Sequence, residues 1–336
     1  MPKGSFPIIY KKESQLPKKV AIDACTNCQL DCCGCWRNCN PDDVKLGYLK
    51  FEDFKNFIDK HPFIITVELA SKGEIFLNPQ LIDIIKYGYE KNVRMTAWSG
   101  VNGNYIPDEV AEALVKYNFY GLAFSIDGAC QETYSIYRTN GNYDQVIENI
   151  EKINFYKKKY NSMYPLMTYK MVVFGHNEHE IPLVIEKAKK LNMDYKFDNN
   201  WIINYSPIQN VELAKKLTKR KFLGGDNHIE NMINYYKTKQ NIWFYCADLF
   251  MRPIINFDGE LFACPCCERH FGINVFEQGM MKALNNIELI KIRELLLSGC
   301  TDASGTYCEG CCVFENLKYD EDYQNRKFFY RTKMYG

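Results

Sequence analysis

Residues 23–36 read Asp-Ala-Cys-Thr-Asn-Cys-Gln-Leu-Asp-Cys-Cys-Gly-Cys-Trp. Within this stretch Cys28, Cys32 and Cys35 are separated by three and then two residues, a spacing that no other three of the fifteen cysteines share. Thiolates are soft ligands that suit iron–sulfur clusters, so three of them can bind three irons of a [4Fe–4S] cluster. The fourth iron would have no protein ligand and could bind and reduce a small molecule. The spacing therefore predicts a cluster with one open coordination site.

Two other interpretations of these cysteines have to be weighed. A disulfide framework needs an oxidising compartment, whereas this chain starts without a signal peptide and has an odd number of cysteines. Zinc is the stronger alternative, because Cys-x2-Cys pairs also build zinc ribbons. The strand-like segment Lys19–Ile22, just before the cysteines, favours the iron–sulfur interpretation.

The composition is that of a globular protein without a marked charge. Its 336 residues, 46% of them hydrophobic, are enough for one large domain and a smaller one. The 42 basic and 41 acidic residues leave a net charge of +1, which gives no argument for nucleic acid or a membrane as partner. No apolar run reaches the length of a membrane span, so we expect a cytoplasmic protein.

Apolar strand-like runs alternate with segments of helical period along the first two hundred residues. The expected strands are Val20–Ala24, Ile64–Ala70, Val93–Trp98, Tyr120–Ile126, Leu166–Phe174 and Tyr195–Asn199. The expected helices are Phe51–Lys60, Pro79–Lys91, Pro107–Tyr117, Asp144–Tyr156 and Ile181–Leu191. This alternation predicts a parallel sheet of six β/α units, either a partial barrel or an open doubly wound sheet. Chemistry in such folds sits at the C-terminal ends of the strands, and the cysteine stretch follows the first one.

The cysteine loop, together with motifs after the later strands, resembles the radical S-adenosylmethionine (SAM) superfamily over about residues 18 to 312. The resemblance implies an α/β fold: a partial (β/α)6 TIM-like barrel, then a small Twitch- or SPASM-like domain with a β-hairpin and a helix. It divides the chain into an N-terminal arm (1–17), the barrel (18–206), a helical linker (207–240), an auxiliary-cluster domain (241–315) and a tail (316–336).

Two segments after the second and third strands are similar to SAM-binding motifs of this superfamily. Ser71-Lys72-Gly73-Glu74 resembles the Gly-Gly-Glu segment that holds the SAM amino group, with Lys72 in place of the first glycine. The resemblance assigns Gly73 and Glu74 to SAM. The turn from Trp98 to Gly103 resembles a Thr-Asn-Gly turn, with Ser99 in the place of the asparagine. Taken alone, either segment could be an ordinary turn with exposed polar residues.

The fourth strand ends in Ser125-Ile126-Asp127-Gly128, and Arg138 follows. This run resembles the Ser-Ile-Asp-Gly segment of radical SAM enzymes that carry an auxiliary-cluster domain. The resemblance implies that Ser125 and Asp127 bind the ribose hydroxyls and that Arg138 pairs with the SAM carboxylate, since guanidinium binds carboxylate at two points. Surface polar residues around a turn are the alternative.

Three further residues are candidates around SAM. Asn177 could reach the adenosyl group, or it could cap the next helix with Glu180 completing a capping box. His176 is a candidate for substrate contact or catalysis. Relatives usually carry an aromatic residue just before the third cysteine, but here Gly34 stands there and Trp36 follows, so we expect Trp36 to pack near the adenine.

A second cysteine cluster lies towards the C-terminus. Cys246, Gly259 and Cys264 have the Cys-x12-Gly-x4-Cys spacing that opens SPASM and Twitch domains, within a predicted hairpin, Arg252–Cys264, that turns at Asp258-Gly259. The pair Cys308 and Cys311 follows the expected helix Ile287–Ser298. A SPASM domain would have another cysteine where Leu317 stands, so the shorter Twitch version fits better.

The resemblance assigns four of these cysteines to a second, closed [4Fe–4S] cluster, with zinc as the alternative. Those four ligands are Cys246, Cys264, Cys308 and Cys311. Cys266 or Cys267 could instead donate a hydrogen atom near the substrate, as in some peptide epimerases of this class.

The activity that the resemblance implies is radical chemistry. Flavodoxin or ferredoxin would reduce the first cluster, and SAM would be cleaved to methionine and a 5′-deoxyadenosyl radical that takes a hydrogen atom from the substrate. We expect oxidation of a small carbohydrate-like molecule, with the auxiliary cluster accepting an electron. Peptide epimerisation or crosslinking is the alternative, and the substrate would then be a short peptide. A non-catalytic zinc or iron–sulfur scaffold remains a rival, and the neutral charge disfavours an RNA-modifying enzyme.

Overall fold

The computed structural model describes residues 7–39, 41, 45–200, 202, 205–218, 248–264, 267–298, 302–311 and 314. Residues 219–240 of the expected linker and all of the expected tail 316–336 lie outside these ranges. The described strands form one sheet in the order β6-β5-β4-β3-β2-β1-β7-β8-β9. Their bounds are β1 (Lys19–Ile22), β2 (Thr66–Glu68), β3 (Arg94–Val101), β4 (Gly121–Ser125), β5 (Leu166–Val173), β6 (Asp194–Asn199), β7 (Ile254–Ile255), β8 (Glu260–Cys264) and β9 (Cys267–Asn274).

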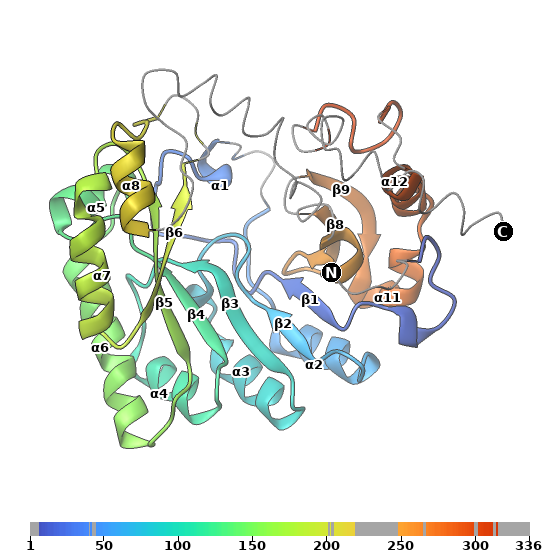
Figure 1. Ribbon diagram of the computed structural model, residues 1–336. Coiled ribbons are helices and arrows are strands. Elements are labelled where there is room, and N and C mark those ends of the chain that lie inside the picture. The colour runs from blue at the N-terminus through green and yellow to red at the C-terminus, as the bar shows by residue number, and fades with distance from the viewer. Residues whose placement is uncertain are drawn as a thin grey trace.

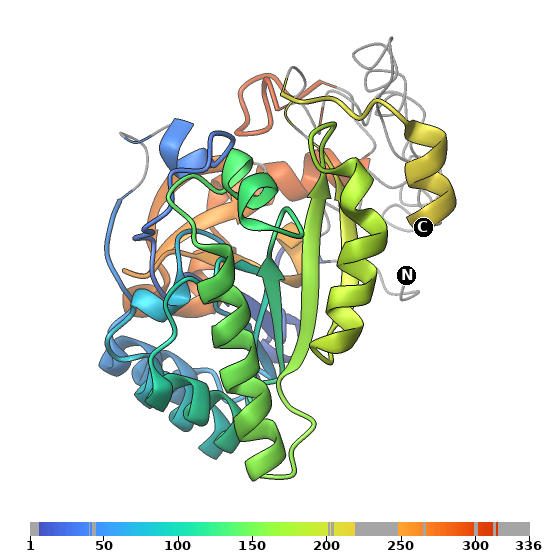
Figure 2. The same ribbon diagram turned by 90° about the vertical axis from the view of Figure 1, so that its left-hand side faces the viewer.

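Strands β1 to β6 are parallel neighbours, which confirms the expected six-stranded parallel sheet and its partial-barrel architecture. Each is linked to the next by helical segments, as parallel strands require. The α-helices are α1 (Trp36–Cys39), α2 (Phe51–Lys60), α3 (Leu81–Glu90), α4 (Asp108–Lys116), α5 (Gln131–Tyr137), α6 (Tyr143–Lys159), α7 (Ile181–Lys190), α8 (Val211–Thr218), α11 (Val275–Leu284) and α12 (Ile287–Ser298). Short 3-10 helices span Glu13–Gln15, Ile75–Leu77 and Glu178–Glu180. Figure 1 shows the curved sheet, and Figure 2 shows α6 and α7 against its outer face.

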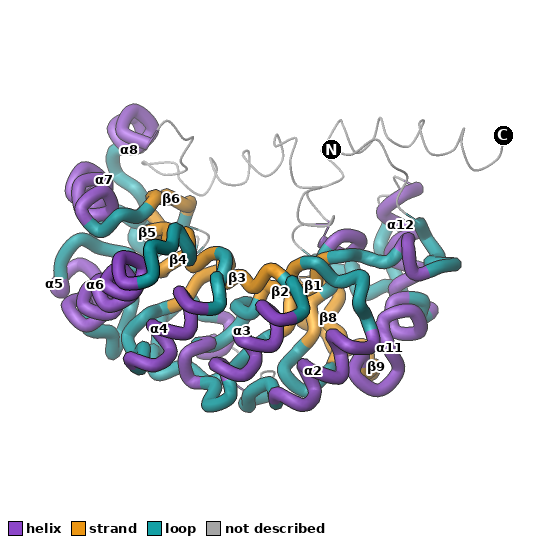
Figure 3. The backbone as a smooth tube through the Cα atoms, turned by 90° about the horizontal axis from the view of Figure 1, so that it is seen from below, coloured by secondary structure: helices purple, strands orange, loops and turns teal. Residues whose placement is uncertain are grey.

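The two faces of the sheet differ in chemistry. Figure 3 shows the strands as an arc with α2, α3, α4 and α6 along its convex side. On β5 the side chains of Met167, Tyr169 and Met171 belong to the main hydrophobic core. Because side chains alternate along a strand, Thr168 and Lys170 face the concave side. The convex face therefore makes the core, and polar groups are left on the concave face.

The C-terminal strands continue this sheet. β7 pairs in parallel with β1, at Ala21 and Ile254, and the hairpin β7-β8 turns at Asp258-Gly259. Gly259 has φ +89°, a conformation that glycine adopts without strain. The predicted hairpin and the predicted helix Ile287–Ser298 are both confirmed. The sequence showed no sign that β7 would add to the barrel's edge, since edge pairing depends on backbone groups that every residue carries.

One strand is longer than expected. β3 was predicted to end at Trp98 but runs to Val101, with a register shift against β4 between Ala97 and Val101. Gly100, at φ +131°, lies inside this irregularity. With this bulge, the strand ends at Val101, three residues after its predicted end at Trp98.

No helix among the described residues is long and apolar enough to span a membrane.

His61 joins the C-terminal segment to the barrel. Its Nδ1–H donates to the carbonyl of Phe57 at 2.8 Å, and its Nε2 accepts from the N–H of Met280 in α11 at 3.1 Å. Both contacts need the neutral ring, because Nε2 can accept only when it carries no proton. Burial lowers the pKa of His61 from its usual 6.5. The unfolded chain therefore binds a proton more readily than the folded chain.

We predict that His61 makes stability depend on pH. The stabilisation it contributes is complete above pH 6.5 and is lost as the pH falls below that value towards the lowered pKa of the folded state. Denaturant unfolding across this range should show a steeper loss of stability in the wild type than in His61→Leu. Parallel curves for the two proteins would contradict the prediction.

Candidate active site at the cysteine loop

The structure brings the three predicted cluster cysteines together. The loop after β1 carries Cys28 and Cys32, and Cys35 directly precedes α1, where its N–H donates to the carbonyl of Cys32 at 3.1 Å. All three pack in one small hydrophobic cluster, separate from the main core, with Leu30, Tyr137, Val172, Phe174, Ile202 and Tyr205. Three soft thiols in one apolar shell at the C-terminal ends of parallel strands are the donor set that a cluster needs.

Two side-chain N–H groups point at these sulfurs. Asn102 Nδ2 lies 3.4 Å from Cys28 Sγ, and Arg138 Nη1 lies 3.6 Å from Cys32 Sγ. Burial raises the pKa of the Cys28 thiol to about 11, so its thiolate needs a cation to form. Within the described ranges no three His, Cys, Asp or Glu side chains converge on a single metal ion. A [4Fe–4S] cluster does not require three side chains to converge on one metal ion, since each thiolate binds a different iron.

A buried carboxylate and a glycine attach the cysteine loop to the loop after β2. Asp23 Oδ1 accepts from the N–H groups of Ser71 and Lys72 at 3.1 and 2.8 Å, and burial raises the pKa of Asp23 to about 6. Gly73 has φ +63°, and a Cβ there would lie 2.3 Å from the carbonyl oxygen of Cys25. Gly73 thus allows a close approach of two backbone segments, the loop after β2 and the cysteine loop.

Glu74 is fully buried beside this loop. Its Oε2 accepts from the N–H of Asn102 at 2.6 Å and its Oε1 from the N–H of Phe76 at 3.3 Å. Burial raises the pKa of Glu74 to about 7. The carboxylate expected to bind the SAM amino group therefore also positions Asn102, and its contact with SAM stays a prediction.

Asn102 is a site residue that the sequence motifs missed. Ser99 was placed at the asparagine position of the turn, but Ser99 is exposed and its N–H donates to Glu68 Oε1 at 2.9 Å. The β3 bulge brings Asn102 to the end of the strand, where it is 5% exposed and reaches Cys28. The Asn102-Gly103 pair was the available signal, since Asn-Gly marks a turn.

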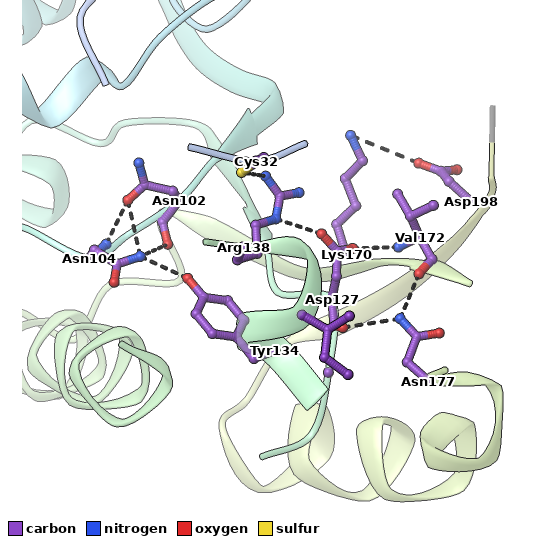
Figure 4. Close-up of polar contacts among 12 residues, drawn as sticks. Cys32, Asn102, Asn104, Asp127, Tyr134, Arg138, Lys170, Val172, Asn177 and Asp198 are labelled. Atoms are coloured by element: carbon purple, nitrogen blue, oxygen red, sulfur yellow. Dashed lines mark hydrogen bonds and ion pairs between the residues drawn. The ribbon is translucent and has the colours of Figure 1, made fainter. Parts of the chain in front are cut away.

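Asp127 and Arg138 form a buried ion pair beside Cys32 (Figure 4). Arg138 Nε donates to Asp127 Oδ2 at 2.6 Å, and Asp127 Oδ1 accepts from the N–H of Val172 at 2.6 Å. Ser125 ends β4 on the same concave face and is 7% exposed. The structure thus gathers the three residues of this motif, while their contacts with SAM stay predictions.

Asn177 is buried, and its amide bonds to backbone groups at the ends of β4 and β5. Its Oδ1 accepts from the N–H of Phe174 at 2.7 Å, and its Nδ2 donates to the carbonyls of Asp127 and Val172, both at 3.0 Å. The alternative capping box is wrong, because Asn177 makes no side-chain cap bond to the helix that follows. Glu180 accepts instead from the Ala129 N–H and the Thr133 hydroxyl. The adenosyl contact of Asn177 stays a prediction.

His176 stacks on Phe174 with ring centroids 5.1 Å apart. Its Nδ1 lies 2.8 Å from Ser206 Oγ, and its buried Nε2 has no hydrogen-bond partner among the described residues.

Gly34 replaces the aromatic residue of relatives, and a Cβ there would meet Ile202 Cδ1 at 2.0 Å. The isoleucine thus fills part of the space beside Gly34. The side chain of Trp36 lies outside the described part.

Only part of the predicted auxiliary site is described. Cys308 and Cys311 lie in one turn, where the Cys311 N–H donates to the carbonyl of Cys308 at 3.1 Å, and both pack against the main core. Cys264 and Cys267 are cross-strand neighbours in β8 and β9, but their side chains are not described. Cys246 and Cys266 lie outside the described residues. The second cluster and the proposed hydrogen-atom donor therefore stay predictions.

Comparisons with known proteins find one curated relative and solved structures with a similar fold. No family model matches the chain. An AdoMet-dependent heme synthase from Methanosarcina barkeri is 28% identical over 177 residues, which are 52% of this chain and 48% of that relative. The chain thus matches about half the length of this curated relative.

Solved structures share the fold at low identity. SuiB from Streptococcus suis, bound to S-adenosylmethionine, superposes with a TM-score of 0.61 at 14% identity, covering 89% of this chain and 72% of SuiB. The protein anSMEcpe with bound AdoMet gives a TM-score of 0.52 at 14% identity, covering 94% and 97% of the two chains.

We predict that Gly73→Ala destabilises the protein by roughly 2 to 4 kcal/mol, because a non-glycine residue at positive φ and an overlap with the backbone both cost energy. Gly272→Ala is the matched control, since Gly272 has φ +62° with nothing within 4 Å of the added Cβ, and we expect it to cost about 1 kcal/mol. Urea unfolding measures both variants. Equal losses of unfolding free energy in the two variants would show that the close contact between Gly73 and the cysteine loop adds nothing to the cost of the substitution.

Proposed function

We propose that this chain is a radical SAM enzyme, which binds a [4Fe–4S] cluster through Cys28, Cys32 and Cys35 and cleaves SAM reductively. The single observation that carries the proposal is the packing of these three thiols in one apolar shell, with N–H groups of Asn102 and Arg138 on two of the sulfurs. Cys28, Cys32 and Cys35 would hold the cluster, which, if reduced by flavodoxin or ferredoxin, would supply the electron that splits SAM into methionine and a 5′-deoxyadenosyl radical.

The residues around the loop would hold SAM in place. We assign Arg138 to the SAM carboxylate because guanidinium binds carboxylate at two points and its side chain is 15% exposed beside Cys32. Asp127 keeps that guanidinium oriented. Glu74 and Gly73 line the approach to the amino group, while Ser125, Ser99, Asn177 and Trp36 remain candidates for the adenosyl part. The apolar shell of Tyr137, Phe174 and Val172 would exclude water from the reacting groups.

For the overall reaction we propose oxidation of a small molecule by loss of a hydrogen atom and then an electron. Cys308 and Cys311, with Cys246 and Cys264, would ligate a second [4Fe–4S] cluster that accepts this electron. The alternative is modification of a peptide, as SuiB has been solved with its precursor peptide SuiA. The polar concave face of the sheet fits a small polar substrate better than an apolar one.

We predict that Cys28→Ala/Cys32→Ala/Cys35→Ala forms no 5′-deoxyadenosine with dithionite and SAM under anaerobic conditions, and loses about four irons per chain. Chromatography and iron analysis measure the two quantities. Cys33→Ala/Cys39→Ala is the matched control, since these two cysteines, one in the same loop and one at the end of α1, are exposed. Nucleoside formation by the triple variant would refute the assignment.

We predict that Asn102→Leu lowers the midpoint potential of the cluster. The amide N–H stabilises the extra negative charge of the reduced state at the Cys28 sulfur. Loss of about 1 kcal/mol of this stabilisation corresponds to roughly 40 mV for one electron. Spectroscopic redox titration measures the potential, with Asn154→Leu, a remote amide that binds Leu191, as control. An unchanged potential would show that the amide does not act on the cluster.

A further inference from the structure

Two lysines and an aspartate lie side by side on the concave face at β5 and β6. The strand register places Lys170 beside Lys196 and Val172 beside Asp198. On β6 Phe197 belongs to the main core, so Lys196 and Asp198 point to the opposite, concave face with Lys170. None of these three residues takes part in the cluster or SAM contacts assigned above.

Asp198 is shared by the two lysines. Its Oδ2 lies 3.0 Å from Lys196 Nζ and 3.9 Å from Lys170 Nζ. Lys170 also donates a hydrogen bond to the carbonyl of Ser99 at 2.8 Å. Figure 4 shows the Lys170 side chain extending towards Asp198, close to Asp127 and Arg138. The two lysines and the aspartate together carry one positive charge.

Lys170 has the properties of a ligand-binding cation. Its side chain is 17% exposed, so the ammonium is mostly desolvated, and burial lowers the pKa of Lys170 despite the opposing effect of Asp198. An ammonium has three N–H donors, and among the described residues one of them donates to Ser99, while the Asp198 oxygen is beyond hydrogen-bond distance. An anion would restore the hydrogen bonds that desolvation removes.

The position of Lys170 connects it to the cysteine loop. Val172, two residues further along β5 on the same face, packs in the cluster that contains Cys32. Two residues of a strand span about 7 Å, so Lys170 lies just below the cluster site on the concave face. Gly100 borders the ammonium, and a Cβ at Gly100 would lie 3.7 Å from Lys170 Nζ and 2.4 Å from Ser125 Oγ. Glycine at this position keeps the space between these two polar groups open.

We propose that Lys170, with Lys196 beside it, binds a carboxylate of the substrate, and that the substrate of this enzyme is therefore an organic acid. The proposal rests on the proposed SAM-dependent function and specifies the class of its substrate. The carboxylate is held below the cysteine loop, so the carbon that loses hydrogen lies a few bonds away, towards Arg138 and Cys32.

The charge balance favours a carboxylate over a phosphate. A single carboxylate group, with one negative charge, matches the one excess positive charge of Lys170, Lys196 and Asp198. A phosphate dianion would place two charges on one group beside the Asp198 carboxylate, and like charges at such distances repel. Asp198 thus disfavours a bound group that itself carries two negative charges.

The test uses the full-length, iron-loaded protein and succinate as probe. Saturation-transfer NMR detects bound succinate, and we expect a saturable signal that neutral succinamide does not compete away. Lys170→Met should abolish the signal, whereas Lys86→Met should leave it unchanged, because Lys86 lies on α3 and pairs with Glu90. No signal in the wild type, or an equal signal in Lys170→Met, would overturn the proposal.

A second variant keeps the test decisive if Lys170→Met does not fold. Asp198→Asn removes the competing carboxylate, and we expect succinate to bind roughly threefold more tightly. Weaker or unchanged binding would overturn the proposal. If inorganic phosphate occupies the site at a lower concentration than succinate does, the choice of a carboxylate is overturned.

The same samples separate this inference from the function on which it rests. Formation of 5′-deoxyadenosine from SAM is measured without any succinate. Its absence would refute the SAM-dependent function, while the succinate signal would still report on Lys170. Nucleoside formation without succinate binding would refute only the carboxylate site.

Discussion

The buried ion pair between Asp127 and Arg138 is the interaction on which the arrangement of the site depends. Asp127 is fully buried at the end of β4, and it binds both the guanidinium of Arg138 and the N–H of Val172 on β5. Arg138 in turn reaches Cys32. One carboxylate therefore connects two strands, the end of α5 and the cysteine loop. Removing one partner of such a pair typically costs about 3 to 5 kcal/mol, because the other charge is left buried and unpaired.

A second set of contacts fixes other parts of the same loop. Asp23 and Gly73 hold the loop after β2 against the cysteine loop, and Glu74 positions Asn102 beside Cys28. Two supports therefore hold the cysteine loop, one built on the buried carboxylate of Asp127 and the other on those of Asp23 and Glu74. Such preorganisation limits the movement of the sulfurs, which favours a site that holds a cluster and a small ligand in fixed geometry.

Much of this arrangement could be predicted from the sequence. Helix Phe51–Lys60 has the expected bounds, because its apolar residues recur at helical spacing. The six parallel strands follow from their apolar runs, and the turn at Asp258-Gly259 from its turn chemistry. Asn102 was missed because the β3 bulge is a backbone irregularity that leaves no clear pattern of side chains. The cap predicted at Asn177 failed because its Oδ1, the atom that a cap would use, accepts from the N–H of Phe174 instead.

We propose above all that Cys28, Cys32 and Cys35 leave one iron of a cluster open to SAM. Electron paramagnetic resonance of the dithionite-reduced protein, recorded with and without SAM, tests this claim most directly. Coordination of SAM to an open iron changes the electronic environment of the cluster, so we predict that SAM shifts the g-values, and that the shift is absent when Cys28, Cys32 and Cys35 are replaced by alanine. A spectrum that SAM leaves unchanged, or reconstituted protein that holds zinc and gives no signal, would contradict the account.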